Sequence, residues 1–384
     1  MVGFRFDGGG EMSTAPGAVT VLFIHGFLDD HTVWADVIDS LAGAVDAVHY
    51  DLPGFGTRAV ADPSAVSLES LAADARQLLA GIDTPVIVVG QSLGSQVAEL
   101  VATQYPDQVA GLVLITPVPL GGTRLPEETI APFRALGGDL GAQRDARRQL
   151  SPGLDQRQLD RLTRIGAQAA SDVVARYVDI WNEGVQDAPA VSAFTGPVLI
   201  IRGGSDGFVT DELLATITPR FPQASVRAIE AGGHWVHVEY PWEVADAIAA
   251  IVESVSASRT TAGWRRSFAE QSESTFADEF AADVVLEAST LAEPVRGKEQ
   301  VAAVLAAAST IYESLEFTEE AHSGSTSYLQ WRATAFGGSQ IQGVTILDRD
   351  ASGKVVTAAI HHRPLGVVMR FSAEIHQRLG KAAS

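Results

Sequence analysis

The sequence contains no cysteine among its 384 residues. A disulfide framework, a thiolate metal site and cysteine redox chemistry are therefore excluded for this chain. Basic residues are scarce relative to acidic ones, because 27 Lys and Arg stand against 47 Asp and Glu and give a formal net charge of -20. A surface with that charge repels nucleic acid and anionic lipid, so we expect no nucleic-acid partner.

Long hydrophobic runs are also missing. No uninterrupted apolar stretch approaches the roughly 18 residues that a membrane-spanning helix needs. The N-terminal segment "MVGFRFDGGGEMSTAPGAVTVLF" has no basic region followed by a long apolar run, as a secretory signal would. We therefore expect a soluble, cytoplasmic protein without a membrane partner.

Short β-branched runs alternate with helical segments between residue 18 and about residue 256. Most of these runs are continuously apolar, which is typical of strands buried on both faces of a parallel sheet covered by helices. The predicted strands are "AVTVLFIHG", "VDAVHYD", "PVIVVGQS", "VAGLVLITP", "PVLIIRGGSD" and "ASVRAIEAGG". This part of the chain is predicted to be an α/β domain.

The segment from about 118 to 190 interrupts this pattern. It is rich in Arg, Gln, Asp and Leu and has no strand-like run, with "RQLDRLTRI" and "DVVARYVDIW" as its clearest helices. We predict a helical insertion that acts as a lid and sets specificity. The Arg-rich stretch "QRDARRQL" is expected to be a solvated helix face rather than an anion site.

The composition changes after "PWEVADAIAAIVESV", which is predicted to be the last helix of the α/β domain. The small, polar segment "SASRTTAG" is predicted to be a linker. Helices and then the alternating segments "SYLQWRATAF", "SQIQGVTILD" and "KVVTAAIHHR" follow, which indicates antiparallel strands with one covered face. We therefore predict two domains, over residues 1–258 and 259–384, the second a small α+β domain.

The segment "VVGQSLGSQVAEL" contains a serine between two glycines, Ser92. A buried strand precedes it, and an apolar helical stripe follows it, formed by Leu93, Val97, Leu100 and Val101. Gly90 and Gly94 lack Cβ atoms, so the chain can turn sharply and expose the Ser92 hydroxyl above the sheet. This context predicts that Ser92 is a nucleophile.

A serine nucleophile needs a base and an acid that orients the base. "EAGGHWVHVEYP" places His234 in a glycine-rich turn after the last strand, and "LIIRGGSD" ends a strand at Asp206. The order Ser92, Asp206, His234 is that of a Ser-Asp-His triad on a strand-turn-helix nucleophile elbow. No carboxylate occurs in "LVLITPVP", the alternative place for the acid, which favours Asp206.

The sequence resembles the α/β-hydrolase fold family over roughly its first 255 residues. The segments that carry the resemblance are "FIHGFLDDHTVW", "YDLPGFG", "VGQSLGS", "IRGGSDGFV" and "GGHWVHVEYP". The resemblance implies an oxyanion hole formed by the backbone N–H groups of Phe27 and Leu93. It also implies a serine hydrolase that cleaves a small carboxylic ester or lactone through an acyl-enzyme, without metal or organic cofactor.

Other reaction types share much of this pattern. C–C bond hydrolases, cofactor-free perhydrolases and cofactor-independent dioxygenases use the same fold, and a non-enzymatic ligand receptor can keep its shell. Serine rather than aspartate at position 92 argues against a haloalkane dehalogenase. We expect His25 and His237 to be structural, and Asp29 and Asp30 to cap the helix that begins near Thr32.

Residues from about 264 to 379 resemble the NTF2-like, SnoaL-type cone. The resemblance rests on "FADEFAADVVLEAS", "LAEPVRGKEQVAAVLAAA", "SLEFTEE", "SYLQWRATAF" and "IQGVTILDRDASGKVVTAAIHHRPLGVV". Strand alternation turns one of His361 and His362 inward, and we expect a hydrogen-bonded strand histidine rather than a second active site. The other sheet face carries large side chains, and we predict that it forms a homodimer interface, the alternative being that it covers the lid or pocket of the first domain within the same chain: Tyr328, Phe336, Val344 and Ile346.

Overall fold

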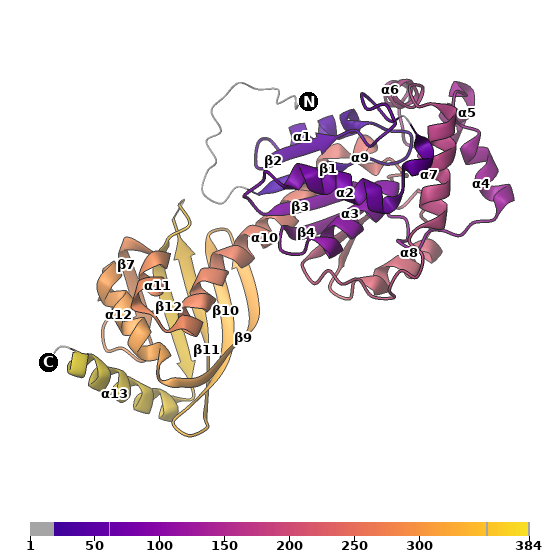
Figure 1. Cartoon of the computed structure of the whole chain (residues 1–384). Coiled ribbons are helices and arrows are strands. Elements are labelled where there is room, and N and C mark those ends of the chain that lie inside the picture. Colours follow the sequence, from indigo (N-terminus) through magenta and orange to yellow (C-terminus); the bar gives the residue numbers. More distant parts are fainter. Residues whose placement is uncertain (1–18, 61, 351, 383–384) are drawn as a thin grey trace. The chain divides into compact units, whose positions relative to one another are not determined.

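The computed structural model describes residues 19–60, 62–350 and 352–382, with the side chains of 257–260 and 381–382 left aside (Figure 1). The chain divides into two compact units, which meet in the sequence between Val255 and Ser256. The first unit is built on a parallel sheet and the second on a mixed sheet. Each unit has hydrophobic cores of its own.

The first unit contains a six-stranded, fully parallel sheet in the order β2-β1-β3-β4-β5-β6. The predicted parallel sheet is confirmed, because each of the six predicted segments forms one of its strands. These are β1 (Thr20–Ile24), β2 (Asp46–Tyr50), β3 (Val86–Gln91), β4 (Val109–Ile115), β5 (Val198–Gly203) and β6 (Ser225–Ile229). The central strands β1 and β3 are buried along their whole length, which explains their continuous apolar runs.

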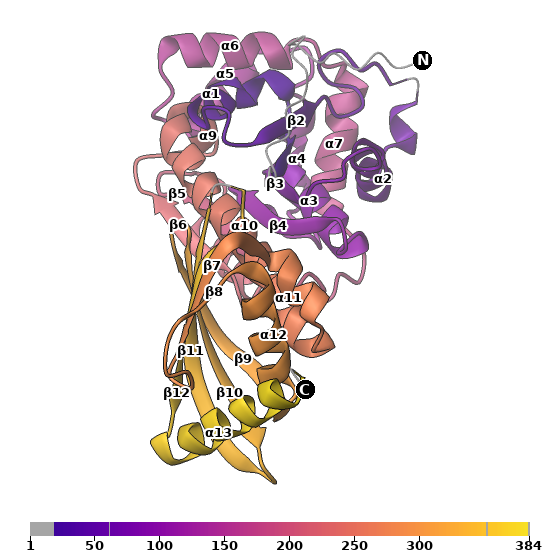
Figure 2. The same cartoon turned by 90° about the vertical axis from the view of Figure 1, so that its left-hand side faces the viewer.

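Helices cover both faces of this sheet (Figures 1 and 2). One core lies under α2 (Leu68–Leu79), α3 (Leu93–Gln104) and α8 (Asp211–Ile217). The other core lies under α1 (Ala35–Ser40), α9 (Val236–Glu239) and the start of α10 (Pro241–Glu270). Short 3-10 turns complete the unit: η1 (His31–Trp34), η2 (Pro63–Ala65) and η3 (Thr218–Arg220).

Four helices lie between β4 and β5 in the chain, inside the segment predicted to be a helical insertion. They are α4 (Glu127–Arg134), α5 (Leu140–Leu150), α6 (Gln156–Gly166) and α7 (Ser171–Glu183). Asp139 and Asp155 accept backbone hydrogen bonds at the starts of α5 and α6, which fixes where these helices begin. Phe133 of α4 and Trp181 of α7 line the same cavity as Ser92, so the helices cover the carboxyl ends of the strands.

The predicted linker is wrong, because α10 runs without a break through "SASRTTAG". This segment contains no proline, and its first glycine is Gly263, so nothing in it removes a backbone donor and stops the helix. A small, polar composition is typical of linkers, but alanine, serine and arginine also permit a helix.

The second unit contains a six-stranded sheet in the order β8-β7-β12-β11-β10-β9. Its strands are β7 (Phe280–Ala288), β8 (Val295–Arg296), β9 (Tyr312–Ser323), β10 (Thr326–Ala335), β11 (Ser339–Arg349) and β12 (Val355–Arg363). The predicted antiparallel pairing of β10, β11 and β12 is confirmed, whereas β7 pairs with β12 in parallel. The helices that pack with it are α11 (Glu273–Glu279), α12 (Lys298–Ser309) and α13 (Leu365–Ala382).

The two faces of this sheet differ in burial, as the alternation predicts. In β10, Leu329 and Trp331 are buried, whereas Tyr328, which directly precedes Leu329, is 39% exposed. Val344 and Ile346 are half-buried on the same side as Tyr328. The assignment of Phe336 to this face is wrong, since Phe336 lies after β10 in a turn with φ of 56° and its ring packs against Phe371 of α13. The turn breaks the alternation on which that assignment rested.

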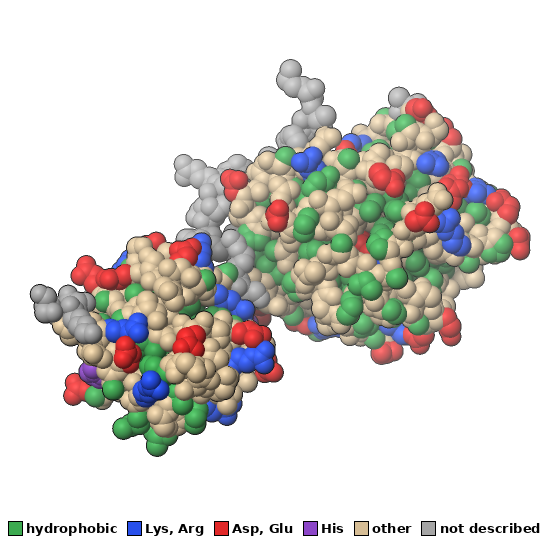
Figure 3. Space-filling view, turned by 60° about the horizontal axis from the view of Figure 1, so that its bottom comes forward, with side chains coloured by type: hydrophobic (Ala, Val, Ile, Leu, Met, Phe, Trp, Pro, Cys, Tyr) green, Lys and Arg blue, Asp and Glu red, His purple; other side chains and the backbone are tan. Residues whose placement is uncertain are grey.

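Surface charge is mixed on the face that Figure 3 shows, where acidic and basic side chains are interspersed over both units. Among the described residues, no helix is long and apolar enough to cross a bilayer.

Candidate active site

Ser92 occupies the turn between β3 and α3 in a conformation that few residues adopt. Its φ of 51° and ψ of -123° place it in a strained region of backbone space. The turn is tight, since a Cβ on Gly90 would lie 2.2 Å from the carbonyl oxygen of Gly94. A Cβ on Gly94 would lie 2.5 Å from the carbonyl oxygen of Ile24 in β1. The two glycines of the motif therefore permit the close approach that raises Ser92 above the strand.

Ser92, His234 and Asp206 form a continuous hydrogen-bonded row. Nδ1 of His234 lies 2.8 Å from Oδ2 of Asp206, and Nε2 lies 2.9 Å from Oγ of Ser92. The other oxygen of Asp206 accepts the backbone N–H groups of Phe208 at 2.7 Å and Val209 at 3.0 Å. Because the carboxylate accepts the Nδ1–H, Nε2 is free to accept the serine hydroxyl. All three side chains are nearly buried.

The carboxyl group of Asp206 stays ionised in this setting. Burial alone would raise its pKa, but the charge and hydrogen bond of His234 and the two backbone amides outweigh burial, so the pKa of Asp206 lies below its ordinary value. An ionised Asp206 stabilises a positive charge on the imidazole of His234.

A small cavity of about 40 Å³ lies directly above Ser92, and we call it the inner cavity. Its walls are mostly apolar and aromatic: Phe27, Gln91, Ser92, Val118, Phe133, Leu150, Trp181, Phe208, His234 and Trp235. Phe27 belongs to the loop after β1, and Leu93 is the first residue of α3. The first amides of a helix have no intrahelical acceptor, so the Leu93 N–H is available to a ligand beside Ser92.

Two side chains that the sequence analysis did not single out hold the loop of His234. Nε2 of Gln91 and Oγ1 of Thr116 each donate a hydrogen bond of 3.0 Å to the backbone carbonyl of His234. Gln91 directly precedes Ser92 and Thr116 directly follows β4. The sequence could have pointed to both residues, because they lie at the carboxyl ends of neighbouring strands, where the site residues gather.

The structural roles predicted for His25 and His237 are confirmed. Nδ1 of His25 lies 2.8 Å from the carbonyl oxygen of Gly26, and Nε2 accepts the backbone N–H of Leu52 at 2.9 Å. These bonds tie the loop after β1 to the loop after β2. His237 is fully buried with its ring 4.6 Å from that of Trp34, and burial lowers its pKa to about 3.

The capping role predicted for Asp30 is confirmed and that for Asp29 is wrong. Asp30 accepts the backbone N–H of Thr32 at 2.9 Å at the start of η1. Asp29 is buried and accepts Nε1 of Trp235 at 2.8 Å and a guanidinium N–H of Arg147 at 3.2 Å. Its side chain turns into the protein, where a buried cation from α5 balances its charge.

On α5 the predicted solvated arginine face holds for Arg148, which is exposed, and in part for Arg144, which is half-buried, but it is wrong for Arg147. Its side chain is 1% exposed, and Nη2 donates to the carbonyl oxygen of Leu28 at 2.7 Å as well as to Asp29. The guanidinium carbon lies 5.4 Å from the ring centre of Trp235, the residue after His234. Arg147 therefore connects α5 with both the loop after β1 and the loop of His234.

The end of α5 reaches the His234 loop through two further bonds. The backbone N–H of His234 donates to the carbonyl oxygen of Leu150 at 2.9 Å, and Oγ of Ser151 accepts the N–H of Trp235 at 2.8 Å. The inserted helices thus contribute directly to the position of His234.

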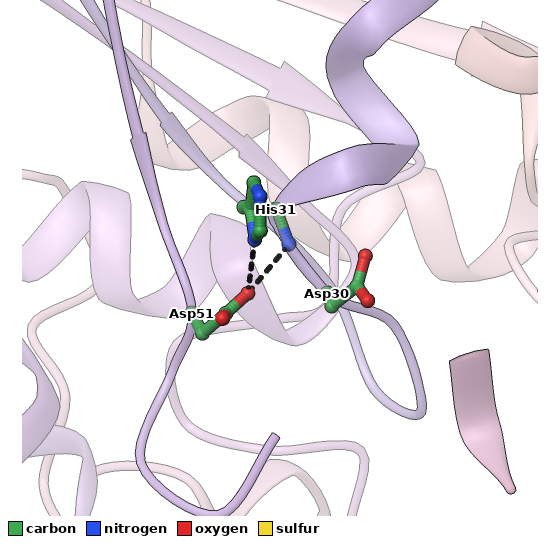
Figure 4. Close-up of side chains that lie close together, drawn as sticks. All are labelled: Asp30, His31 and Asp51. Atoms are coloured by element: carbon green, nitrogen blue, oxygen red, sulfur yellow. Dashed lines mark hydrogen bonds and ion pairs between the residues drawn. The ribbon is translucent and has the colours of Figure 1, made fainter. Parts of the chain in front are cut away.

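Asp30, His31 and Asp51 lie close together near the same loop, with potential metal-ligand atoms within 4.8 Å of one another (Figure 4). One oxygen of Asp51 accepts both the backbone N–H and Nδ1 of His31, and its other oxygen accepts the N–H and hydroxyl of Thr57. Asp30 is engaged with Thr32. Both oxygens of Asp51 and one oxygen of Asp30 are thus engaged by the chain itself, and the Asp51–His31 bonds connect the loop after β1 with the loop after β2.

His362 is the inward-facing histidine of the second unit, and His361 is exposed. The ring nitrogens of His362 lie 3.1 Å from Oγ of Ser289 and 3.3 Å from the hydroxyl of Tyr312. Burial lowers the pKa of His362 to about 4. This is the hydrogen-bonded strand histidine that the sequence predicts, and its recorded partners include no carboxylate.

Comparison with known proteins matches residues 21–247, more than half of the chain, to the model of the alpha/beta hydrolase family. The chain is 30% identical over 202 residues to the sn-1-specific diacylglycerol lipase ABHD11 of Mus musculus, covering 47% of this chain and 64% of that relative's length. It is 28% identical over 261 residues to the esterase Rv0045c of Mycobacterium tuberculosis, covering 62% of this chain and 84% of the relative.

A solved structure has the same fold as the first unit. The thermophilic esterase from Thermogutta terrifontis superposes with a TM-score of 0.54 at 23% identity, over 62% of this chain and 90% of the esterase. The family match, the parallel sheet and the serine turn between β3 and α3 agree. The chain belongs to the alpha/beta hydrolase family.

Proposed function

We propose that the protein is a serine hydrolase that cleaves a carboxylic ester or lactone through an acyl-enzyme. One observation carries the proposal: Oγ of Ser92 lies 2.9 Å from Nε2 of His234, whose Nδ1 lies 2.8 Å from Asp206, at the floor of an apolar cavity. Membership of the family and its esterase and lipase relatives support ester hydrolysis.

The proposed reaction starts with attack of Oγ of Ser92 on the carbonyl carbon of the substrate. Nε2 of His234 takes the serine proton, and Asp206 holds the imidazole in the required tautomer and balances its charge. The backbone N–H groups of Phe27 and Leu93 donate hydrogen bonds to the oxyanion. His234 then protonates the alcohol oxygen as the C–O bond of the substrate ester breaks. The alcohol leaves, and the acyl group remains esterified to Ser92.

Water completes the proposed cycle. His234 takes a proton from a water molecule while the oxygen of that water attacks the carbonyl carbon of the acyl-enzyme. His234 then returns the proton to Oγ of Ser92 as the carboxylic acid leaves. Every proton transfer uses Ser92, His234 and water, so the proposal includes no metal and no organic cofactor.

The helices of the 118–190 insertion are proposed to be the lid of a hydrolase domain that ends near residue 258. Phe133, Leu150 and Trp181 from these helices line the inner cavity, which supports a role in substrate choice. Lids of this kind exclude water and select substrates by shape.

Residues 259–384 are proposed to form an NTF2-like cone that joins two chains into a homodimer. Tyr328 and Ile346 are cross-strand neighbours on the open face of the sheet, and Ala359 of β12 continues the apolar strip beside Ile346. A Tyr328→Arg variant should be monomeric in light scattering where the natural chain is dimeric. A natural chain that is already monomeric would overturn this part of the proposal.

Reaction with a fluorophosphonate tests the proposed catalytic role of Ser92. Such probes react with activated serines, so mass spectrometry of the digested adduct should find the phosphonyl group on Ser92. The labelled protein should lose hydrolysis of short aryl esters in proportion to labelling. If the protein neither reacts with the fluorophosphonate nor hydrolyses short aryl esters, it is instead a ligand-binding protein with a hydrolase fold.

A further inference from the structure

A second and larger hollow adjoins the inner cavity, and we call it the outer hollow. Its volume is about 590 Å³, against about 40 Å³ for the inner cavity. It lies between α4, α5 and the segment from Gly207 into α8. Its lining residues are Thr123, Leu125, Thr129, Phe133, Ala146, Gln149, Leu150, Gly207, Phe208, Thr210, Glu212, Leu213 and Thr216.

Aromatic side chains separate the two spaces. Phe133, Leu150 and Phe208 line both the inner cavity and the outer hollow. The ring centres of Phe133 and Phe208 lie 6.1 Å apart, and each packs edge-to-face against Trp181, at 5.7 Å and 5.5 Å. We call Phe133, Trp181 and Phe208 the aromatic partition. It stands beside the proposed base, because the Phe208 ring centre is 5.8 Å from that of His234.

The two volumes decide how a substrate can be placed. The inner cavity is more than ten times smaller than the outer hollow, so it accommodates only a compact group beside Ser92. The outer hollow falls in the range of about 300–1,000 Å³ that is typical of small-molecule sites. A substrate with its carbonyl at Ser92 therefore has one compact part, and any longer part must extend into the outer hollow.

The outer hollow favours an uncharged chain. Its lining consists of apolar side chains, threonine hydroxyls and one glutamine, and Glu212 supplies its single ionisable side chain. No cation stands among these residues to bind a carboxylate or phosphate at the far end of a chain. A terminal anion would approach the negative charge of Glu212 in a protein whose net charge is -20.

We propose that the preferred substrate is a neutral ester with a compact group at Ser92 and a medium-length, uncharged acyl chain in the outer hollow. Phe133 and Phe208 then determine chain-length specificity, because their rings line both spaces and stand at the boundary that the chain has to cross. This inference rests on the proposed function of Ser92, His234 and Asp206. It adds the substrate class and the side chains that select it.

The test compares kcat/KM of the full-length protein for three methyl esters, with acid release followed by titration: the acetate, the octanoate and the half ester of octanedioic acid. The natural protein should prefer the octanoate to the octanedioate by about tenfold or more, because the second ester carries a terminal carboxylate. An equal or greater rate with the octanedioate would overturn the proposal of a neutral chain.

Three substitutions probe the aromatic partition and the outer hollow. Phe133→Ala removes a partition ring from α4 and should raise the octanoate-to-acetate ratio about fivefold or more. Phe208→Ala should act in the same direction while keeping the backbone N–H that Asp206 accepts. Leu213→Trp should fill the outer hollow and lower the ratio about tenfold.

Leu140→Trp is the matched control, since Leu140 is 48% exposed at the start of α5 and lines neither space. Its octanoate-to-acetate ratio should equal that of the natural protein. If the Phe133, Phe208 and Leu213 variants all keep the natural ratio while still hydrolysing the acetate, the inference is overturned and the proposed function stands. If the natural protein neither hydrolyses the acetate nor reacts with a fluorophosphonate, the proposed function fails and the inference fails with it.

Discussion

His234 in the first unit is buried and His362 in the second is half-buried, and both have partners at their two ring nitrogens. His234 lies between Ser92 and the carboxylate of Asp206, whereas His362 lies between the hydroxyl groups of Ser289 and Tyr312. Burial penalises a charged imidazole in each place, and it lowers the pKa of His362 to about 4. Only His234 has a carboxylate that compensates for the charge it would gain as a general base.

The two serines beside these histidines differ in a corresponding way. Ser92 sits at a strained turn with its hydroxyl directed to Nε2 of His234. Ser289 lies just after β7, where its oxygen accepts the backbone N–H of His362 at 2.8 Å. One serine is presented to a cavity, and the other fixes a strand. Of these two serine–histidine contacts, only the one at Ser92 is combined with a carboxylate on the histidine and a turn that faces a cavity, the arrangement that an activated serine nucleophile requires.

Replacing the two serines gives the largest expected contrast. Ser92→Ala should lower kcat/KM for a short aryl ester by 10³-fold or more, and by up to about 10⁶-fold, because the nucleophile is lost. Ser289→Ala should leave the same kcat/KM within about twofold, since the recorded hydrogen bonds of Ser289 go to Ile360 and His362 of β12. Steady-state hydrolysis of p-nitrophenyl acetate measures both. Comparable losses in the two variants would remove the functional difference between the sites.

Replacing Asp206 leaves His234 without a carboxylate partner, as His362 is. Asp206→Asn keeps the shape of the side chain but no longer balances a charged imidazole, and it can favour the wrong tautomer, so kcat should fall by about 10⁴-fold. Circular dichroism checks that the variant is folded. Most of the natural activity surviving in this variant would mean that a different carboxylate orients His234.

The position of the His234 loop also depends on α5, through Arg147 and the carbonyl group of Leu150. Arg147→Met leaves Asp29 buried without its cation, and the free energy of unfolding of the full chain should fall by about 3–5 kcal/mol. Arg148→Met is the control, because Arg148 is an exposed neighbour on the same helix and should change stability by less than about 0.5 kcal/mol. Urea unfolding followed by circular dichroism measures the difference. Equal stability of the two variants would count against a structural role for the Arg147 pair.

The smallest expected effect concerns His362 and pH. Its pKa is about 4 in the folded chain and close to 6.5 when unfolded, so the unfolded state binds more protons between these values. Stability is therefore fully present above pH 6.5 and is lost as the pH falls toward 4. His362→Gln should remove about 2 kcal/mol of the loss that the natural chain suffers between pH 7.5 and pH 5.

Urea unfolding of the variant and the natural chain at the two pH values checks this. His237 is present in both proteins, so its own pH-dependent contribution to stability cancels in the comparison. Hydrolysis of p-nitrophenyl acetate at pH 7.5 should be the same for the His362→Gln variant and the natural chain. An unchanged pH dependence of unfolding would show that His362 is not buried in its neutral form.

The strand segments of the parallel sheet, the turn at Ser92 and the positions of Asp206 and His234 at strand ends could be predicted from the sequence. Continuous apolar runs identify buried parallel strands, and glycine identifies a turn in which the backbone approaches its neighbours closely. The carboxyl ends of parallel strands share one edge, so residues that end different strands meet there. This rule brings residues far apart in the chain, such as Ser92 and His234, to the same edge of the sheet.

The burial of Arg147, its pairing with Asp29 and the outer hollow were decided only by the tertiary structure. A charged residue on a helix reads as solvated in the sequence, and nothing local to α5 indicates that the loop after β1 supplies a buried carboxylate. Likewise, the contact of Phe133 with Phe208 joins residues 75 positions apart on different elements. Such contacts depend on how helices pack over the sheet, and that packing is set by side chains from several segments at once, which no pattern within one segment records.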